Sequence, residues 1–309
     1  WRVIKSKPAS PKSSTANLTR ESLASLLEAQ STKGVDIQSA QAELDLYDHR
    51  QAQKAFYIAL YGTMSSGKSS LINALLPKAQ QATSVIGGTT QEVVQFQWQA
   101  PRRNTSLVRA KSCTDEPLLE NIAHIHLLDM PGFNQNQAED LALLASEEAQ
   151  RAHIVLFVCD NDLTRHEYDQ LQHLIKLNKP IIIVLNKADN FSKAELSQLE
   201  ARLNQYLPAT CLWELVTVQT GGMEHVVVID HQGQEHEQTR PRTSNVHTLR
   251  TALARWFDDY QDAIEQARAD NAVQLAHQQL MSSQQQHREQ QATQLVRQYA
   301  PVSYTHLRA

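Results

Sequence analysis

Residues 62–69 combine the residue types that bind a polyphosphate. They read Gly-Thr-Met-Ser-Ser-Gly-Lys-Ser and satisfy the pattern G-x-x-x-x-G-K-[ST]. Gly62 and Gly67 allow backbone angles that residues with a Cβ avoid, so that successive N–H groups can point at the phosphates. Lys68 can reach the β- and γ-phosphates, and the Ser69 hydroxyl can bind Mg²⁺. The expected phosphate contacts are Gly62, Ser65, Ser66, Gly67, Lys68, Ser69 and Ser70.

The segments on either side of this loop fit the prediction. The apolar run 56–61 (FYIALY) indicates a buried strand, and 69–76 (SSLINALL) has apolar residues at helical spacing before Pro77. A helix that begins in the loop directs its positive N-terminal end at the phosphates. The alternative is a chance turn rich in Gly and Ser, and the strand before it and the helix after it argue against that.

A second motif, Asp-Met-Pro-Gly, stands at 129–132. Asp129 follows the apolar run 122–128, at the end of a predicted strand, where it can organise the Mg²⁺ shell. The backbone N–H of Gly132 would approach the γ-phosphate. That contact exists only while the γ-phosphate is present, so Gly132 is a candidate hinge of a switch.

A third motif, Asn-Lys-Ala-Asp, stands at 186–189 after the apolar run 180–185. The Asp189 carboxylate can accept two hydrogen bonds from the N1–H and N2–H₂ groups of guanine, and adenine lacks that donor pair. Lys187 can lay its alkyl stem along the base. With Asn186, the three motifs in this order predict a site for GTP or GDP with Mg²⁺.

On these motifs, together with Gly88-Thr89-Thr90, the chain resembles the TRAFAC-class P-loop GTPases of the Era-like and dynamin-like branch, over residues 55–257. The resemblance implies a GTPase that hydrolyses GTP to GDP and phosphate and acts as a Mg²⁺-dependent switch. It also implies that Thr90, with Thr89 as the alternative, closes onto Mg²⁺ and the γ-phosphate. The backbone of Gln219 or Thr220 would contact guanine, where the family usually has Ser-Ala.

One departure bears on how water is positioned. Many switch GTPases have a glutamine directly after Asp-x-x-Gly, and this chain has Phe133, which can neither donate nor accept. We therefore expect slow intrinsic hydrolysis that is stimulated by dimerisation or by a monovalent cation, K⁺ or Na⁺, near Ser65. The residues assigned to hydrolysis are Ser65, Lys68, Thr90 and Gly132, and those assigned to Mg²⁺ are Ser69, Thr90 and Asp129.

The predicted fold is a three-layer α/β domain with a mostly parallel, six-stranded sheet, flanked by N- and C-terminal helices. Apolar runs that read as strands alternate with helical patterns, which favours a parallel sheet covered on both faces. The six runs are 56–61, 92–99, 122–128, 154–159, 181–186 and 215–219. The expected divisions are a disordered lead (1–16), N-terminal helices (17–54), the GTPase domain (55–257), a Gln-rich helical segment (258–300) and a non-native, adaptor-like end (301–309).

Several local patterns have a structural explanation. Thr19 is a candidate N-cap of a helix over 18–30, and Thr164 with Glu167 forms a capping box after the acidic run 160–164. The pair His124 and His126 lacks a third ligand nearby, so packing is favoured over metal binding. Residues 226–234 indicate a hairpin inserted after the last core strand, and 245–257 a closing helix.

Composition limits the partners. A net charge of −4 gives no reason to expect nucleic acid, and no stretch approaches the roughly 18 apolar residues of a membrane span. Three widely spaced cysteines fit a reducing cytoplasm. The chain is also similar to bacterial Era-like GTPases that continue into a hydrophobic, membrane-associated C-terminal domain. We expect truncation before such a domain, with membrane association and a homodimer as candidate properties.

Three other functions stay open at this point. The first is a guanine-nucleotide-dependent module that binds a partner or membrane with negligible turnover. The second is an Era-like GTPase associated with RNA or the ribosome, although the chain has no recognisable RNA-binding module or basic stripe. The third is an ATP-dependent P-loop kinase, against which Asp189 argues.

Overall fold

The structure is a computed structural model of the 309-residue chain. It describes residues 18–76, 82–86, 93–98, 124–130, 139–208, 211–229, 235–242 and 244–299. The described residues form two compact units. One unit covers 53–268, and the other combines residues up to 52 with those from 269 onward.

The larger unit is built on a seven-stranded sheet with the order β2-β3-β4-β1-β5-β6-β7. Parallel pairing joins β4, β1, β5, β6 and β7, whereas β3 pairs antiparallel with both β2 and β4. The mostly parallel α/β fold predicted from the sequence is therefore confirmed. The strands are β1 (Ala55–Tyr61), β2 (Ala82–Ile86), β3 (Val93–Trp98), β4 (His124–Asp129), β5 (Ile154–Cys159), β6 (Ile181–Leu185) and β7 (Trp213–Thr217).

The sheet has one strand more than the six that were predicted. The additional strand is β2, whose sequence ATSVI has neither a continuous apolar run nor an apolar–polar alternation. It lies at the edge of the sheet and is defined by its antiparallel pairing with β3. Because its own sequence carries no strand period and the strand depends on pairing with its neighbour, periodicity alone does not find it.

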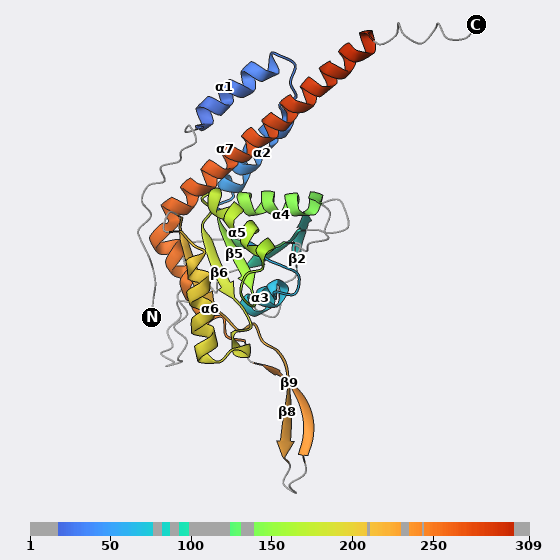
Figure 1. The fold of residues 1–309 in the computed structure, drawn as a ribbon. Coiled ribbons are helices and arrows are strands. Elements are labelled where there is room, and N and C mark those ends of the chain that lie inside the picture. Colours follow the sequence, from blue (N-terminus) through green and yellow to red (C-terminus); the bar gives the residue numbers. More distant parts are fainter. Residues whose placement is uncertain are drawn as a thin grey trace, which may run out of the picture. The chain divides into compact units, whose positions relative to one another are not determined.

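Helices cover both faces of the sheet (Figure 1). Alternate residues of β1 enter two separate cores, with Ile58 and Leu60 in one and Tyr57 and Ala59 in the other, as the period of a strand requires. The first core is closed by α3 (Lys68–Leu75) and the start of α7 (His247–Tyr299), the second by α4 (Glu139–Arg151), α5 (Arg165–Lys176) and α6 (Lys193–Gln205).

The capping box of α5 is present as predicted. The Glu167 N–H donates to Thr164 Oγ1 at 3.3 Å, and Glu167 Oε2 accepts from the Thr164 N–H at 2.9 Å. These bonds satisfy two backbone N–H groups that the start of the helix would otherwise leave unpaired.

The predicted hairpin is also present. Strand β8 (Gly222–Ile229) pairs antiparallel with β9 (Glu235–Arg242), and the two form a separate two-stranded sheet. The expected turn at 231–234 lies outside the described residues. The hairpin begins directly after Gly221, which lines the pocket described below.

The smaller unit consists of α1 (Arg20–Ser31), α2 (Gln38–Ala52) and the second part of α7. Its core contains Leu23, Leu27, Leu44, Val273 and Leu280. Thr19 caps α1 by accepting from the Ser22 N–H, as predicted. The expected closing helix at 245–257 and the Gln-rich segment after it are one continuous helix of 53 residues.

Of the two histidines of β4, His126 has a packing role. The His126 ring stacks on Tyr57 with 4.9 Å between ring centroids, and Gln95 Nε2 lies 2.6 Å from His126 Nδ1. Among the described residues, no group of three His, Cys, Asp or Glu side chains could hold a metal ion. No described helix has a segment long and apolar enough to cross a membrane.

Candidate functional site

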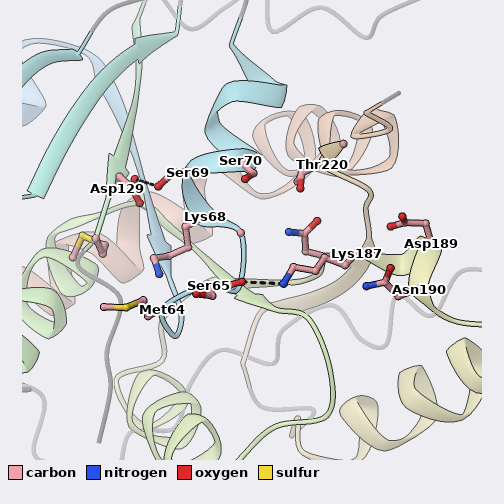
Figure 2. Close-up of a pocket in the computed structure, with 14 residues that line it drawn as sticks. Met64, Ser65, Lys68, Ser69, Ser70, Asp129, Lys187, Asp189, Asn190 and Thr220 are labelled. Atoms are coloured by element: carbon pink, nitrogen blue, oxygen red, sulfur yellow. Dashed lines mark hydrogen bonds between the residues drawn. The ribbon is translucent and has the colours of Figure 1, made fainter. Parts of the chain in front are cut away.

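A pocket of about 550 Å³ lies at the carboxyl ends of the parallel strands. Register places Leu60 of β1 beside Asp129 of β4, and Cys159 of β5 beside Leu185 of β6. The loops that follow these strands therefore meet at one edge of the sheet, which is where open α/β sheets bind ligands. The pocket is lined by Met64, Ser65, Gly67, Lys68, Ser69, Ser70, Asp129, Met130, Asn186, Lys187, Asp189, Asn190, Thr220 and Gly221 (Figure 2).

The loop between β1 and α3 needs its two glycines. A Cβ on Gly62 would lie 2.3 Å from the Val158 carbonyl oxygen, and one on Gly67 would lie 2.1 Å from Asn186 Nδ2. The backbone is left-handed at Ser65 (φ 68°) and at Gly67 (φ 95°). Alternation of this kind turns successive N–H groups toward one side, which makes an anion-binding concavity. Helix α3 begins at Lys68 and adds its positive end.

The Lys68 side chain is held over this loop. It is only 7 % exposed, and Nζ donates to the Gly62 carbonyl at 2.9 Å and to the Thr63 carbonyl at 2.8 Å. Burial lowers the pKa of Lys68, and the nearby Asp129 carboxylate opposes that shift. An anionic ligand in the pocket would stabilise the charged ammonium in the same way.

Asp129 and Ser69 fit the chemistry of a small divalent cation. The Ser69 hydroxyl donates to Asp129 Oδ2 at 2.7 Å, while Asp129 Oδ1 is buried and has no protein partner in the described part of the chain (Figure 2). Burial raises the pKa of the Asp129 carboxyl, although the Ser69 hydrogen bond and Lys68 act in the opposite direction. Hard oxygen ligands of this type suit Mg²⁺. A buried carboxylate oxygen without a protein partner fits a site for such a cation.

The third motif lies at the other end of the pocket. Asn186 is fully buried, and its Nδ2 donates to the Ser66 carbonyl at 3.0 Å. Lys187 Nζ donates to the Ser65 carbonyl at 3.0 Å and to Asp160 Oδ2 at 2.5 Å. Both side chains thus tie the segment that carries Asp189 to the phosphate loop. Asp189 itself lines the pocket, as Figure 2 shows.

The two residues expected near the guanine oxygen differ in position. Thr220 lines the pocket, whereas Gln219 does not. The Gln219 N–H donates to the Asn245 carbonyl at 3.0 Å, and the Asn245 N–H donates back at 2.6 Å. The backbone N–H of Gln219 is therefore engaged with the segment before α7. The switch residues Thr89, Thr90, Gly132 and Phe133 lie outside the described residues.

Four lining residues were not among the predicted contacts: Met64, Met130, Asn190 and Gly221. Met64 and Met130 lie inside the first two motifs, but at positions where the patterns allow any residue. Asn190 and Gly221 directly follow Asp189 and Thr220. Only their adjacency to predicted contacts could have indicated them.

A strand, a glycine-rich loop and a helix with a buried lysine, joined by a serine–aspartate pair, define the P-loop class of nucleotide-binding domains. Comparison with known proteins narrows the class. Residues 57–187 match the family described as "50S ribosome-binding GTPase". They form a P-loop GTPase domain of the TRAFAC class, in the Era-like branch.

The relatives share about half of this chain. An uncharacterized protein of Methanocaldococcus jannaschii is 27% identical over 154 residues, which are 48% of this chain and 80% of that protein. GTPase Era of Aquifex aeolicus is 27% identical over 175 residues, 52% of each chain. The tRNA modification GTPase MnmE of Mycoplasma mycoides is 31% identical over 151 residues, 47% of this chain and 28% of that protein.

One of the solved structures to which this chain is similar is a variant of Aquifex aeolicus Era bound to GDP and AlF4⁻. The two sequences are 26% identical in the matched region, which covers 54% of this chain and 51% of the Era chain, and the TM-score is 0.40. The chain spans only about half the length of Era and less of MnmE.

Proposed function

We propose that the chain binds GTP with Mg²⁺, hydrolyses it to GDP and phosphate, and changes its affinity for a partner with the nucleotide state. The observation that carries this proposal is the position of Asp189. It lines the same pocket as Lys68, Ser69 and Asp129, so one ligand can engage both ends. The Asp189 carboxylate at the base end suits the N–H donors of guanine, and the Lys68 ammonium with the Mg²⁺ ligands at the other end suits the negative phosphates.

Each end of the pocket has a defined task. Ser69 and Asp129 would hold Mg²⁺, which when bound neutralises charge on the phosphate oxygens. Lys68 places its ammonium beside the terminal phosphates and stabilises negative charge there as the bond between the γ-phosphorus and the bridging oxygen breaks. Water supplies the attacking oxygen, and the products are GDP and inorganic phosphate.

Water positioning distinguishes this site from GTPases with a glutamine after Asp-x-x-Gly, because Phe133 stands at that position. We assign part of that task to a monovalent cation near Ser65. Ser65 lines the pocket in a left-handed conformation and directs its carbonyl to Lys187. We also assign Thr90 and Gly132 to hydrolysis, as the two switch residues that would contact the γ-phosphate.

The test is single-turnover GTP hydrolysis in matched K⁺ and Na⁺ buffers, over a range of protein concentrations. We expect slow hydrolysis that K⁺, or a higher protein concentration through a homodimer, accelerates. Equal rates in both salts, with no dependence on protein concentration, would contradict the roles of the cation and the dimer. GTP binding without any hydrolysis would favour the alternative, a nucleotide-dependent module with negligible turnover.

A second candidate is a ribosome-associated GTPase. The matching family is described by its binding to the 50S ribosome, and MnmE is described as a tRNA modification GTPase. The net charge of −4 argues against a large electrostatic contribution to RNA binding. The test is co-sedimentation with ribosomal subunits and with liposomes, each in the presence of GDP or of a GTP analogue. Sedimentation with the subunits would favour this candidate, and sedimentation with the liposomes would favour a cytoplasmic protein that associates with a membrane.

A further inference from the structure

Glu167 connects the phosphate loop to the helix beside it. The side chain lies in the first turn of α5 and is 6 % exposed. Its Oε1 accepts from the Thr63 hydroxyl at 2.9 Å. Its Oε2 accepts from the Thr164 N–H at 2.9 Å and from the Thr164 hydroxyl at 2.8 Å. One carboxylate oxygen therefore serves the helix cap, and the other serves the loop.

Thr63 in turn supports the lysine of the loop. The Thr63 carbonyl accepts from Lys68 Nζ at 2.8 Å and from the Ser66 hydroxyl at 3.0 Å. A continuous set of hydrogen bonds thus runs from α5 through Glu167 and Thr63 to Lys68. Because the Thr63 hydroxyl is fixed by a buried carboxylate, the orientation of its peptide group is restricted as well.

The same region holds the loop at a second point. Asp160, at the end of β5, accepts from Lys187 Nζ, and Lys187 also donates to the Ser65 carbonyl. This second contact is 38–40 % exposed, and exposed ion pairs contribute little. Of these two contacts, the buried one made by Glu167 therefore contributes more to the support of the loop.

We propose that Glu167 is a positioning residue for nucleotide binding and hydrolysis. It fixes Thr63, whose carbonyl holds Lys68 where the ammonium meets the terminal phosphates. This inference rests on the proposed function. A helix cap alone requires only Oε2, and the contact of Oε1 with Thr63 is the additional feature.

Two substitutions separate positioning from capping. Thr63→Val removes the hydroxyl at nearly constant shape and leaves the cap of α5 intact. Glu167→Gln leaves a single acceptor oxygen, so the Thr63 hydroxyl and Thr164 can no longer each donate to a carboxylate oxygen of their own. Thr63→Ser keeps the hydroxyl and is the conservative rescue. Tyr61→Phe is the matched control, because it removes the neighbouring hydrogen bond from Tyr61 to Gln170 of α5 at 2.8 Å.

The experiment measures GTP and GDP affinity, single-turnover hydrolysis and thermal stability of the full chain for each variant. Thr63→Val should lower kcat/KM for GTP by roughly 10- to 100-fold, as expected when a catalytic group is misplaced. GTP affinity should fall more than GDP affinity, since Lys68 reaches the γ-phosphate only in GTP. Thr63→Ser should restore most of the rate, and the Thr63→Val/Glu167→Gln double variant should be no worse than the poorer single one.

Tyr61→Phe should lose a similar amount of stability but keep its rate within about twofold of the wild type, because its hydroxyl does not support the loop. The positioning role would be overturned if Thr63→Val hydrolysed GTP at the wild-type rate, or if the rate loss of the double variant equalled the product of the two single losses. Either result would leave the proposed function intact. A wild-type protein that binds no guanine nucleotide would refute both the proposed function and this inference.

Discussion

At the scale of single residues, Ser69 and Asp129 determine whether the pocket can hold a divalent cation. They come from different elements, α3 and β4, and their oxygens lie 2.7 Å apart. The second oxygen of Asp129 is buried without a protein partner among the described residues. A bound cation would satisfy that oxygen and would offset the burial that raises the pKa of the carboxyl.

Removal of the Ser69 hydroxyl should therefore weaken the dependence of GTP binding on Mg²⁺. For Ser69→Ala we expect the Mg²⁺ concentration at half-maximal binding to rise by roughly 10-fold or more, since an oxygen ligand and its partner are lost. Titration of Mg²⁺ with a fluorescent GTP analogue measures this. Ser25→Ala, which changes an exposed serine of α1, is the control and should match the wild type. Identical Mg²⁺ titrations for Ser69→Ala and the wild type would count against the proposed cation site.

Much of the site could be predicted from residue patterns. Gly62–Ser69, Asp129 and Asn186–Asp189 are contiguous motifs at strand ends, so sequence order places them at one edge of the sheet. Two features could not be predicted. The Thr63–Glu167 bond joins residues 104 apart, and a local pattern reveals only the capping box. The pairing of Gln219 with Asn245 depends on how the chain enters α7.

At the scale of elements, His153 joins the start of β5 to β1 and α7. Its Nδ1 accepts from the Tyr57 N–H at 3.0 Å, its ring stacks on Phe56 at 4.1 Å, and Nε2 lies 3.2 Å from Glu265. Burial lowers its pKa to about 4, Arg268 and Lys179 reinforce the shift, and Glu265 opposes it. Between about pH 4 and 6.5 the folded protein therefore keeps His153 neutral, whereas the same residue in the unfolded chain binds a proton.

Stability should consequently fall as pH decreases through this window. The unfolded group titrates near 6.5 and the folded one near 4. Between these values the unfolded state binds more protons, so this residue lowers the free energy of unfolding by up to about 3 kcal/mol as the pH falls from 6.5 to 4. Urea unfolding at intervals from pH 4 to 7.5 tests this. His153→Phe should be less stable at neutral pH but should show a shallower pH slope, and an unchanged slope would contradict the assignment.

At the scale of the whole molecule, the pattern of elements was largely predictable and their continuity was not. Buried strands such as β5 and β6 are uninterrupted apolar runs, which sequence reveals directly. Helix α7 has no break between its first part, which packs on the sheet, and its second part, which packs on α1 and α2. Helical propensity alone does not show whether two adjoining helical segments form one helix.

Residues 53–268 form a unit that contains every described residue of the pocket. Nucleotide recognition therefore belongs to this unit, in which the residues that follow four strands of one sheet, β1, β4, β6 and β7, line one pocket. The base end depends on Asp189 and the phosphate end on Lys68, so the identity of the ligand tests the arrangement as a whole.

The most direct measurement is competition among GTP, ATP and xanthosine triphosphate for the wild-type protein and for Asp189→Asn, in the presence of Mg²⁺. The wild type should bind GTP more tightly than ATP by roughly 100-fold or more, because adenine leaves the carboxylate without its donor pair. Asp189→Asn should shift the preference from GTP toward the xanthosine nucleotide. Equal affinity of the wild type for GTP and ATP, or the same order of affinities in both proteins, would contradict the assignment of this pocket to guanine nucleotides.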